Sequence, residues 1–229
     1  MRRRKFTSAS LAAIGLGAVA RGAQAAGLSE GDAALGVRAA LERGATSAVG
    51  LLGKSGGFLD NPKVRIPLPG FLKDAAGLLK ITGQQKRVDD LVLAMNRAAE
   101  AAVPEAKQLL ISAVKSMSVD DARKVITGGD DSVTQFFAAK TRGPLGVKFL
   151  PIVTRETEKV SLADKYNAVA GKAAGMGLLK KDDANVQQYV TTKALDGLYL
   201  MIGEEEKKIR QNPIGTGSAI LGKVFGSLK

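Results

Sequence analysis

The chain has 229 residues, 45% of them hydrophobic and 24% charged, a length and composition typical of one soluble globular domain with appendages. Lysine and arginine total 34 against 22 acidic residues, which gives a formal net charge of +12. Cysteine, histidine and tryptophan are absent, which excludes disulfides, thiolate catalysis and cysteine-ligated zinc, and removes the most common general base and transition-metal ligand. We therefore expect no catalytic triad, no metal site and no cofactor.

Residues 1–25 have the order of features that is typical of a secretory signal peptide. A basic cluster, Arg2 to Lys5, precedes an apolar run over residues 9–20, and Ala23-Gln24-Ala25 supplies small residues for cleavage. Arg3-Arg4-Lys5-Phe6 also fits the core of a twin-arginine signal, so the general secretory route and the twin-arginine route both stay open. No cysteine follows the cleavage site, which excludes a lipoprotein anchor. We expect the mature protein to lie in the periplasm.

The mature chain keeps a smaller positive charge. Cleavage after Ala25 would remove five basic residues and no acidic ones, and would lower the formal charge to +7. A mildly basic surface of this kind suits an anionic component of the cell envelope, but the charge is too small to indicate DNA binding. We therefore expect the partner to be an envelope component, or an anionic or hydrophobic ligand, and not a nucleic acid.

The first helix of the mature chain is predicted from an apolar stripe whose members are three or four residues apart: Ala34, Val37, Leu41, Ala45, Ala48 and Leu52. The end of this helix, Ala48 to Ser55, reads AVGLLGKS and matches the relaxed pattern of a nucleotide-binding P-loop. A P-loop needs a strand before its glycines and a helix that starts at the Lys-Ser pair. Here a helix leads into Gly53, so we interpret Gly53 as a helix end and expect no nucleotide.

Residues 61–69, Asn-Pro-Lys-Val-Arg-Ile-Pro-Leu-Pro, form the one stretch that is predicted to be extended. Its three prolines exclude a helix and a central strand. Lys63 and Arg65 are two residues apart, so we expect their side chains on the same side of the segment. They could present a two-point cation to a phosphate or carboxylate. The alternative is that they are two solvated cations on a rigid loop.

A second apolar stripe predicts a helix that Pro104 either kinks or divides: Val88, Val92, Met95, Ala99, Ala102, Ala106, Leu109 and Ala113. Small residues at 98, 99, 101 and 102 would allow a neighbouring helix to approach closely. Arg97 and Glu100 lie one turn apart on this helix and are candidates to meet the carboxylate of Asp196. The three residues would form either a buried polar network that fixes the register of the helices or a ligand-binding site.

A short helix is predicted that is capped by Ser118-x-x-Asp121 and that ends at Gly128-Gly129. We expect Asp130 or Asp131 to cap the next helix, and we expect a separate helical stretch after Pro151. The string Gly128-Gly129-Asp130-Asp131 is similar to a nucleotide-cyclase signature and to half of a calcium site. We interpret it as helix punctuation, and an anion or cation site at the two aspartates remains the alternative.

A long helix is predicted over residues 184–210. Residues 194–202 are apolar nearly all round, so this part should be central and buried, and a buried Asp196 would need a partner. The pairs Glu204–Lys208 and Glu206–Arg210 are four residues apart and are predicted to form a solvated helix end. The Gly/Ser-rich tail after Pro213 then ends in a short amphipathic helix.

These elements predict an all-α protein: a single irregular multi-helix bundle with one proline-braced extended segment and a short C-terminal amphipathic helix. The predicted domains are a signal peptide over 1–25, a helical domain over 26–212, and a linker with the amphipathic helix over 213–229.

Several phrases together resemble the Gram-negative envelope family known as domain of unknown function 4197. They lie in order along nearly the whole mature chain, at residues 57–69, 95–100, 120–131, 193–199, 204–210 and 223–226. One departure is Gly70, where a polar residue would be expected. The resemblance implies an exported, mostly helical protein of unknown activity, and it brings no catalytic residues.

Three functions remain in consideration. The first, which we favour, is a non-enzymatic periplasmic protein with a binding or structural role in the cell envelope. The second is a carboxylate-based hydrolase of an envelope glycan, which would draw on Glu100, Asp130, Asp131 and Asp196 and would need two carboxylates about 5–10 Å apart in one cleft. The third is a peripheral membrane protein that uses the amphipathic helix of residues 213–229.

Overall fold

The computed structural model describes residues 30–70, 72–73, 76, 81, 83–129, 131–177 and 184–212. The elements with defined bounds in these ranges are α1 (Glu30–Leu52), α3 (Gln85–Ala102), the 3-10 turn η1 (Val103–Glu105), α4 (Ala106–Lys115), α5 (Val119–Thr127), α6 (Ser132–Thr157), α7 (Ser161–Gly175) and α8 (Val186–Gln211). The described residues 70, 72–73, 76 and 81 are also helical. None of the described residues forms a β-strand, which confirms the all-α prediction. The predicted signal peptide, Asp130 and the tail from Pro213 onward lie outside the described residues.

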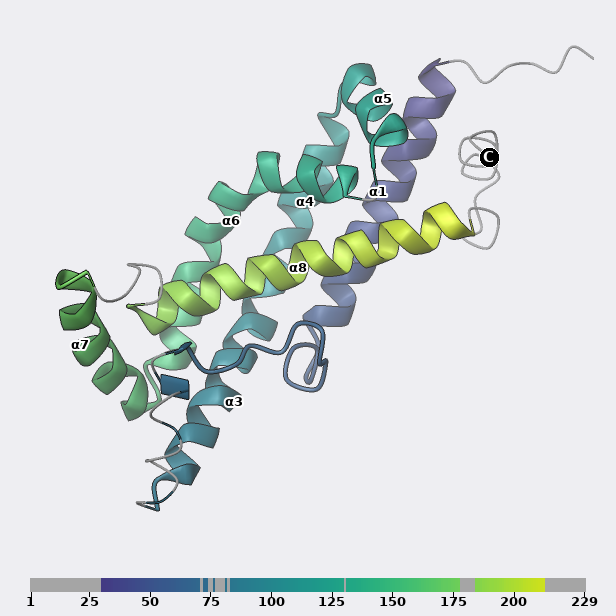
Figure 1. Ribbon diagram of the computed structural model, residues 1–229. Coiled ribbons are helices and arrows are strands. Elements are labelled where there is room, and N and C mark those ends of the chain that lie inside the picture. Colours follow the sequence, from purple (N-terminus) through teal and green to yellow (C-terminus); the bar gives the residue numbers. More distant parts are fainter. Residues whose placement is uncertain are drawn as a thin grey trace, which may run out of the picture.

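Helix α8 organises the bundle. It crosses the front of the molecule in Figure 1 and contacts α1, α3, α6 and α7. Helix α6 packs against α3, α4, α5 and α8, and α1 packs against α4, α5 and α8. Residues 53–69, which follow α1, run beside α8 on the same side of the molecule (Figure 1).

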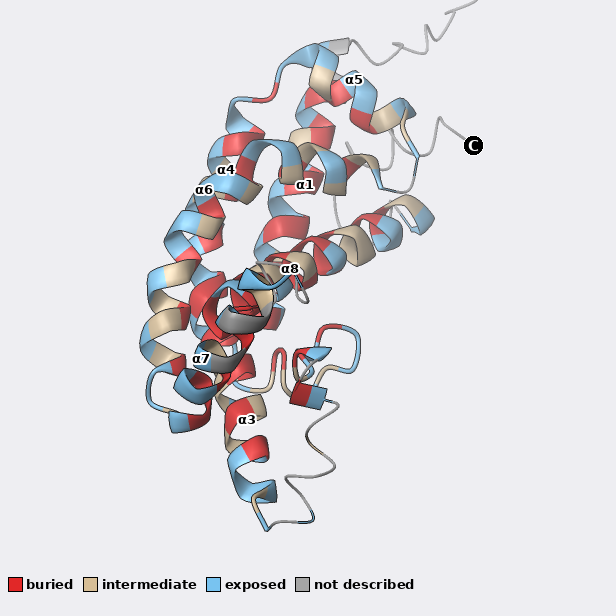
Figure 2. Ribbon diagram, turned by 60° about the vertical axis from the view of Figure 1, so that its left-hand side comes forward, coloured by how far each residue is buried: buried red, intermediate tan, exposed pale blue. Residues whose placement is uncertain are grey.

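Both apolar stripes that the sequence predicts face the core. On α1 every member of the stripe is buried, including Val37, Ala48 and Leu52, which have no exposed surface. On α3 and α4 the stripe residues are buried except Val92 and Leu109, which are half-buried. Figure 2 shows the buried residues on the inner sides of these helices and along the middle of α8. The 3.6-residue period therefore identified the core-facing sides correctly.

Pro104 divides the second predicted helix, as expected. It lies in η1, whose single turn joins the end of α3 to the start of α4. Proline has no backbone N–H and would break the hydrogen-bond pattern inside an α-helix. The 3-10 turn places Pro104 near its start, where an N–H has no partner within the turn. Gly53 likewise ends α1, and its N–H donates to the Val49 carbonyl at 2.8 Å. A helix therefore precedes Lys54, which is the opposite of the order in a P-loop.

The prediction of a separate helix after Pro151 is wrong, because α6 runs unbroken from Ser132 to Thr157 through both Pro144 and Pro151. Both prolines are exposed. The carbonyls that lose a donor are those of Lys140 and Val147, which are also exposed residues, so water can satisfy them. Every fourth residue of α6 from Val133 to Thr157 is buried, and this packing holds the helix together against the local preference of proline.

Candidate functional site

The segment from Phe58 to Pro67 includes one wall of the candidate site, at residues 63–67. Phe58, Val64 and Ile66 are buried in the core, with exposed fractions of 0%, 7% and 1%. Lys63 and Arg65 alternate with the buried residues and are exposed. Both cations therefore lie on the outer side of the segment, as their spacing predicts. The prediction that residues 61–69 are extended is wrong at residues 62–64, which form a turn because the N–H groups of Val64 and Arg65 donate to the Asn61 carbonyl.

Asn96 of α3 holds this segment from the core side. It has no exposed surface. Its side-chain Oδ1 accepts from the Ile66 N–H at 2.8 Å, and its Nδ2 donates to the Ile66 carbonyl at 3.0 Å. Sequence reasoning missed Asn96. The available signal was an amide next to Met95 in the apolar stripe, a position where a polar group needs a buried partner.

Glu100 of α3 holds the start of the same segment. It is only 4% exposed, and its Oε1 accepts from the backbone N–H groups of Phe58 and Leu59, each at 3.1 Å. Arg97 donates to the other oxygen of Glu100 at 2.6 Å and to the hydroxyl of Ser55 at 2.7 Å. Glu100 and Arg97 therefore brace the backbone of the segment.

The prediction that Arg97 and Glu100 meet Asp196 is wrong. The ring of Phe58 packs against Gly197 of α8 so closely that a Cβ atom at Gly197 would lie 2.8 Å from Phe58 Cε1. Since the N–H of Phe58 is bonded to Glu100, the segment lies between α3 and α8 and separates these carboxylates. Sequence patterns predicted both helices, but they did not indicate that a loop packs between them.

Asp196 is not buried, which corrects the second half of the same prediction. It pairs with Arg142 of α6 at 2.9 Å, and the two side chains are 45% and 43% exposed. The guanidinium of Arg142 also lies 5.0 Å from the centre of the Tyr199 ring. Burial raises the pKa of Tyr199, whose hydroxyl is 2.9 Å from that of Thr141.

The charged end of α8 is partly buried, so the prediction of a solvated end is wrong there. Glu206 is 5% exposed; it pairs with Arg210 at 2.7 Å, and burial raises its pKa. Arg210 also donates to the Val125 carbonyl at 2.8 Å and to the Ser132 hydroxyl at 3.0 Å. The predicted pair Glu206–Arg210 forms, whereas Lys208 pairs with Glu205.

Asp131 occupies the cap position of α6 but forms no capping hydrogen bond. Its carboxylate accepts from the side chain of Gln135 at 2.7 Å. The anion beside the first turn of α6 is instead Glu206, which lies within 3.4 Å of the Ser132 hydroxyl. Gly128 and Gly129 follow the last residue of α5, which confirms the prediction that they mark the end of this helix.

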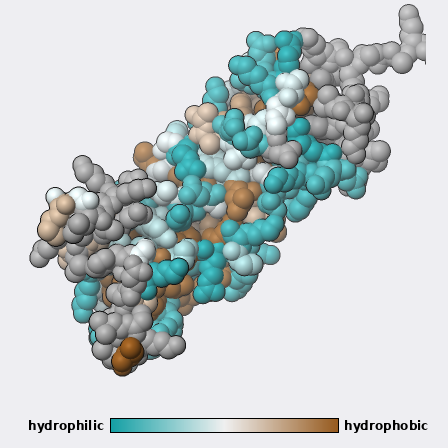
Figure 3. All heavy atoms as spheres, viewed as in Figure 1, coloured by the Kyte–Doolittle hydropathy of each residue, from teal (hydrophilic) through white to brown (hydrophobic). Residues whose placement is uncertain are grey.

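A groove of about 290 Å³ lies beside Asp196, between the segment and α8. One wall is residues 63–67, and the other is Tyr189, Lys193, Asp196, Gly197 and Leu200 of α8. Both walls lie on the side of the molecule seen in Figure 1, and Figure 3 shows that this face is largely hydrophilic with hydrophobic areas between. The sequence-predicted residues Lys63, Arg65 and Asp196 therefore meet at one groove.

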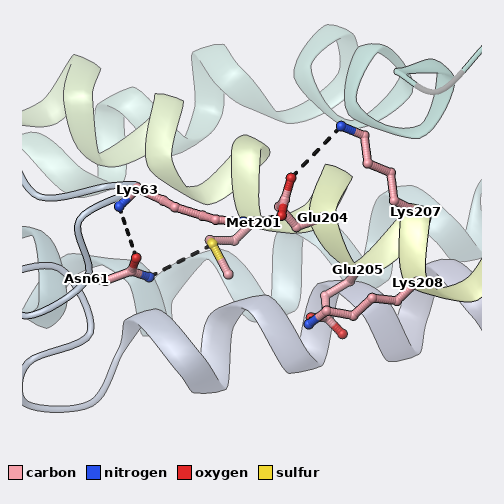
Figure 4. A network of polar contacts seen from close by, with 7 residues as sticks. All are labelled: Asn61, Lys63, Met201, Glu204, Glu205, Lys207 and Lys208. Carbon is pink, nitrogen blue, oxygen red and sulfur yellow. Dashed lines mark hydrogen bonds and ion pairs between the residues drawn. The ribbon is translucent and has the colours of Figure 1, made fainter.

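Two contacts join residues 61–63 to α8 at one end of the groove. The ammonium of Lys63 forms an ion pair with Glu204, which lowers the pKa of that carboxyl. Figure 4 shows this region, where Asn61 accepts from the Lys63 N–H at 3.1 Å and approaches the sulfur of Met201. At the other end of the groove, the Tyr189 hydroxyl donates to the Pro67 carbonyl at 3.2 Å.

Arg65 and Lys193 differ from Lys63. Neither forms an ion pair with any residue that the structure describes. The ammonium of Lys193 lies 5.7 Å from the centre of the Tyr189 ring, which is part of the same wall. The groove thus contains two cations without a carboxylate partner.

Other hollows among the described residues include two larger grooves, one of about 440 Å³ beside residues 54–62 and one of about 460 Å³ beside Asp131 and Lys140. The apolar hollow among α1, α5, α6 and α8 has about 20 Å³ of internal space, which is enough for one water molecule and not for a ligand. No group of three or more acidic side chains within the described ranges could hold a metal ion. Among the same residues, no helix is both long and apolar enough to cross a bilayer.

The sequence stretches that carry the family resemblance contact one another in the folded protein. Residues 57–69 are held by Asn96 and Glu100 of the phrase 95–100, and they pack on Gly197 of the phrase 193–199. Residues 120–131 receive Arg210 of the phrase 204–210 at the Val125 carbonyl. The resemblance therefore follows two sets of packing contacts that join distant parts of the chain.

Three comparisons with known proteins test the family resemblance. A search of curated proteins and a search of solved structures returned no significant match. The model of a family described as "Protein of unknown function (DUF4197)" matches residues 27–226, nearly the whole chain and all of its described residues. The chain therefore belongs to the DUF4197 family.

Proposed function

We propose that the protein is exported and acts in the periplasm as a non-enzymatic protein with a binding or structural role in the cell envelope. Export is supported by residues 1–25, with their basic, apolar and small-residue parts in the order of a signal peptide. The positive charge that remains after cleavage suits anionic envelope components.

The proposal that the protein is not an enzyme rests on the hydrogen bonds and ion pairs of the candidate catalytic carboxylates. Glu100 accepts two backbone N–H groups and the Arg97 guanidinium. Asp196 is paired with Arg142, and Asp131 is bonded to Gln135. Each of these three groups thus has a structural partner of its own, and they belong to α3, to α8 and to the residue before α6. The fourth candidate, Asp130, lies outside the described residues. A glycan hydrolase needs two carboxylates that share one cleft, so this arrangement argues for binding rather than hydrolysis.

The location is tested by cell fractionation and mass measurement. We expect the protein in the periplasmic fraction, with a mass that corresponds to a chain starting at Ala26. Replacing Arg3 and Arg4 by lysine should block export if the twin-arginine route is used, and should leave it intact on the general secretory route. Unprocessed protein confined to the cytosol would contradict the proposal.

The hydrolase alternative has its own test, with purified protein and purified cell-wall glycan as the substrate. We expect no release of soluble fragments by the wild type. Release that is lost in Glu100→Gln or Asp196→Asn would overturn the non-enzymatic reading. The peripheral-membrane alternative depends on residues 213–229, and it predicts that their deletion abolishes binding to liposomes.

A further inference from the structure

We propose that the groove between residues 63–67 and α8 is a binding site for a phosphate group, held by Arg65 and Lys193. This inference rests on the proposed binding role of the protein, and it names the class of ligand: a phosphate ester of the cell envelope, either a lipid headgroup or a free phosphorylated compound.

The charge balance of the groove favours an anion. Its lining contains three cations, Lys63, Arg65 and Lys193, and one carboxylate, Asp196. Lys63 is neutralised by Glu204, and Asp196 is neutralised by Arg142. The two ion pairs cancel, so the charges of Arg65 and Lys193 remain. A phosphate monoester carries a charge of about −1.5 to −2 near neutral pH, which these two cations would match.

The types of the two cations suit phosphate. The planar guanidinium of Arg65 can donate two parallel hydrogen bonds to neighbouring phosphate oxygens. The ammonium of Lys193 is a compact point charge that suits a third oxygen. Its position over the Tyr189 ring keeps it within the groove wall. The two residues come from opposite walls, so a ligand between them would meet a cation on each side.

Contacts within the protein hold the backbone of both groove walls in place. Val64 and Ile66, on either side of Arg65, are buried, and the Arg65 N–H donates to the Asn61 carbonyl at 2.8 Å. Asn96 holds both backbone groups of Ile66, and Tyr189 holds the next carbonyl. The opposite wall, from Tyr189 to Leu200, is part of the long helix α8. Since little backbone has to be ordered on binding, most of the interaction energy would be available for affinity.

The test is a binding titration of the purified chain at constant ionic strength. One arm uses glycerol 1-phosphate, and the other uses vesicles of phosphatidylcholine with and without phosphatidic acid, so that both arms offer a phosphate monoester. We expect Arg65→Gln and Lys193→Gln each to weaken binding about tenfold, because each removes one charge-assisted contact. The matched control is Lys115→Gln, which removes an exposed lysine of α4 outside the groove and should leave binding unchanged.

The two arms identify the source of the phosphate. Affinity for the soluble ester assigns a free phosphorylated compound, and affinity confined to the anionic vesicles assigns a lipid headgroup; both outcomes support the site if the groove variants weaken binding. Equal weakening by Lys115→Gln would reveal a general charge effect and overturn it. Equal binding of succinate would overturn the preference for phosphate, and no binding in either arm would overturn the site.

The replaced side chains are exposed, so circular dichroism and thermal melting should confirm an unchanged fold in every variant. The titration uses purified protein and does not depend on export. A cytosolic location in the fractionation experiment would therefore contradict the proposed function without changing the affinity of the groove, and the two failures can be told apart.

Discussion

Asn96 bonds to both backbone groups of Ile66, with an N–H···Oδ1 distance of 2.8 Å and an Nδ2–H···O distance of 3.0 Å. The two residues are 30 positions apart, and both are buried. An extended segment inside a helical bundle has no neighbouring strand to pair with its backbone, and buried backbone groups must be satisfied. The side-chain amide of Asn96 provides the donor and the acceptor that a strand would provide.

The first prediction concerns this contact. Asn96→Ala would leave the N–H and the carbonyl of Ile66 unpaired in the core, so we expect a loss of about 3 kcal/mol in the free energy of unfolding. Urea unfolding followed by circular dichroism measures it. Gln85→Ala, at an exposed residue at the start of α3, should change the free energy by less than about 0.5 kcal/mol. A similar small effect for Asn96→Ala would show that the contact is dispensable.

The second prediction concerns the approach of Phe58 to α8. A Cβ atom at Gly197 would lie 2.8 Å from Phe58 Cε1 and 3.2 Å from Val64 Cβ. Gly197→Ala should therefore destabilise the protein by about 2 kcal/mol, because the buried ring has to move. Gly50→Ala is the matched control, since that exposed position of α1 has open space and a gain of up to about 1 kcal/mol is expected.

Thermal melting of the two glycine variants distinguishes steric crowding from helix propensity. Opposite signs are expected. If both variants raise the melting temperature, Phe58 is not packed tightly between α3 and α8, and the groove wall is looser than the distances indicate.

The third prediction concerns pH and Glu206. Burial raises the pKa of Glu206 above its ordinary 4.5, and Arg210 and Ser132 act in the opposite direction. Because the folded pKa is above the unfolded value, its favourable contribution is complete below pH 4.5 and is lost as the pH rises through the folded pKa. Glu206→Gln is neutral at all pH values. The free energy of unfolding of the variant should thus improve relative to wild type as the pH rises through this window.

Urea unfolding at a series of pH values measures that difference. The groups that face Glu206 are Arg210 of α8, the hydroxyl of Ser132 on α6 and the backbone of Val133; the hollow beside it is lined on α1 by Val37, Ala40, Leu41 and Gly44. A difference that does not vary with pH, or that falls as the pH rises, would show that Arg210 outweighs burial.

The fourth prediction concerns the capping box of α5. The Ser118 hydroxyl accepts from the Asp121 N–H at 3.0 Å, and the Asp121 carboxylate accepts from the Ser118 N–H at 3.1 Å. Hydrogen bonds from the backbone and the hydroxyl of Ser118 lower the pKa of Asp121 below 3.8. Ser118→Ala should cost about 1 kcal/mol and should raise this pKa part of the way back, because the backbone donor remains.

An NMR titration of the Asp121 carboxyl gives the pKa directly. The contribution of Asp121 to stability is present above pH 3.8 and is lost as the pH falls through the lower folded value. In Ser118→Ala the total loss should be smaller and should end at a higher pH, because the folded pKa lies closer to the unfolded value. An unchanged pKa in the variant would show that the hydroxyl does not contribute.

The sequence by itself determined those features of the fold that depend on residues close together in the chain. The stripe from Ala34 to Leu52 defines the core side of α1, Pro104 divides α3 from α4, and Ser118 with Asp121 starts α5. Each of these features is decided by residues within one or two turns of each other, so the physics is local. The same local order showed that Lys54 follows a helix, and it predicted Lys63 and Arg65 on one side of their segment.

Only the tertiary structure decided the partners of the polar residues. Arg142 meets Asp196 across 54 positions, and Glu206 meets Ser132 across 74. Such pairs depend on which helices pack together, and no short pattern encodes that. Packing also overrode local preference at Pro144 and Pro151, because burial along the opposite side of α6 stabilises the helix more than two exposed prolines destabilise it.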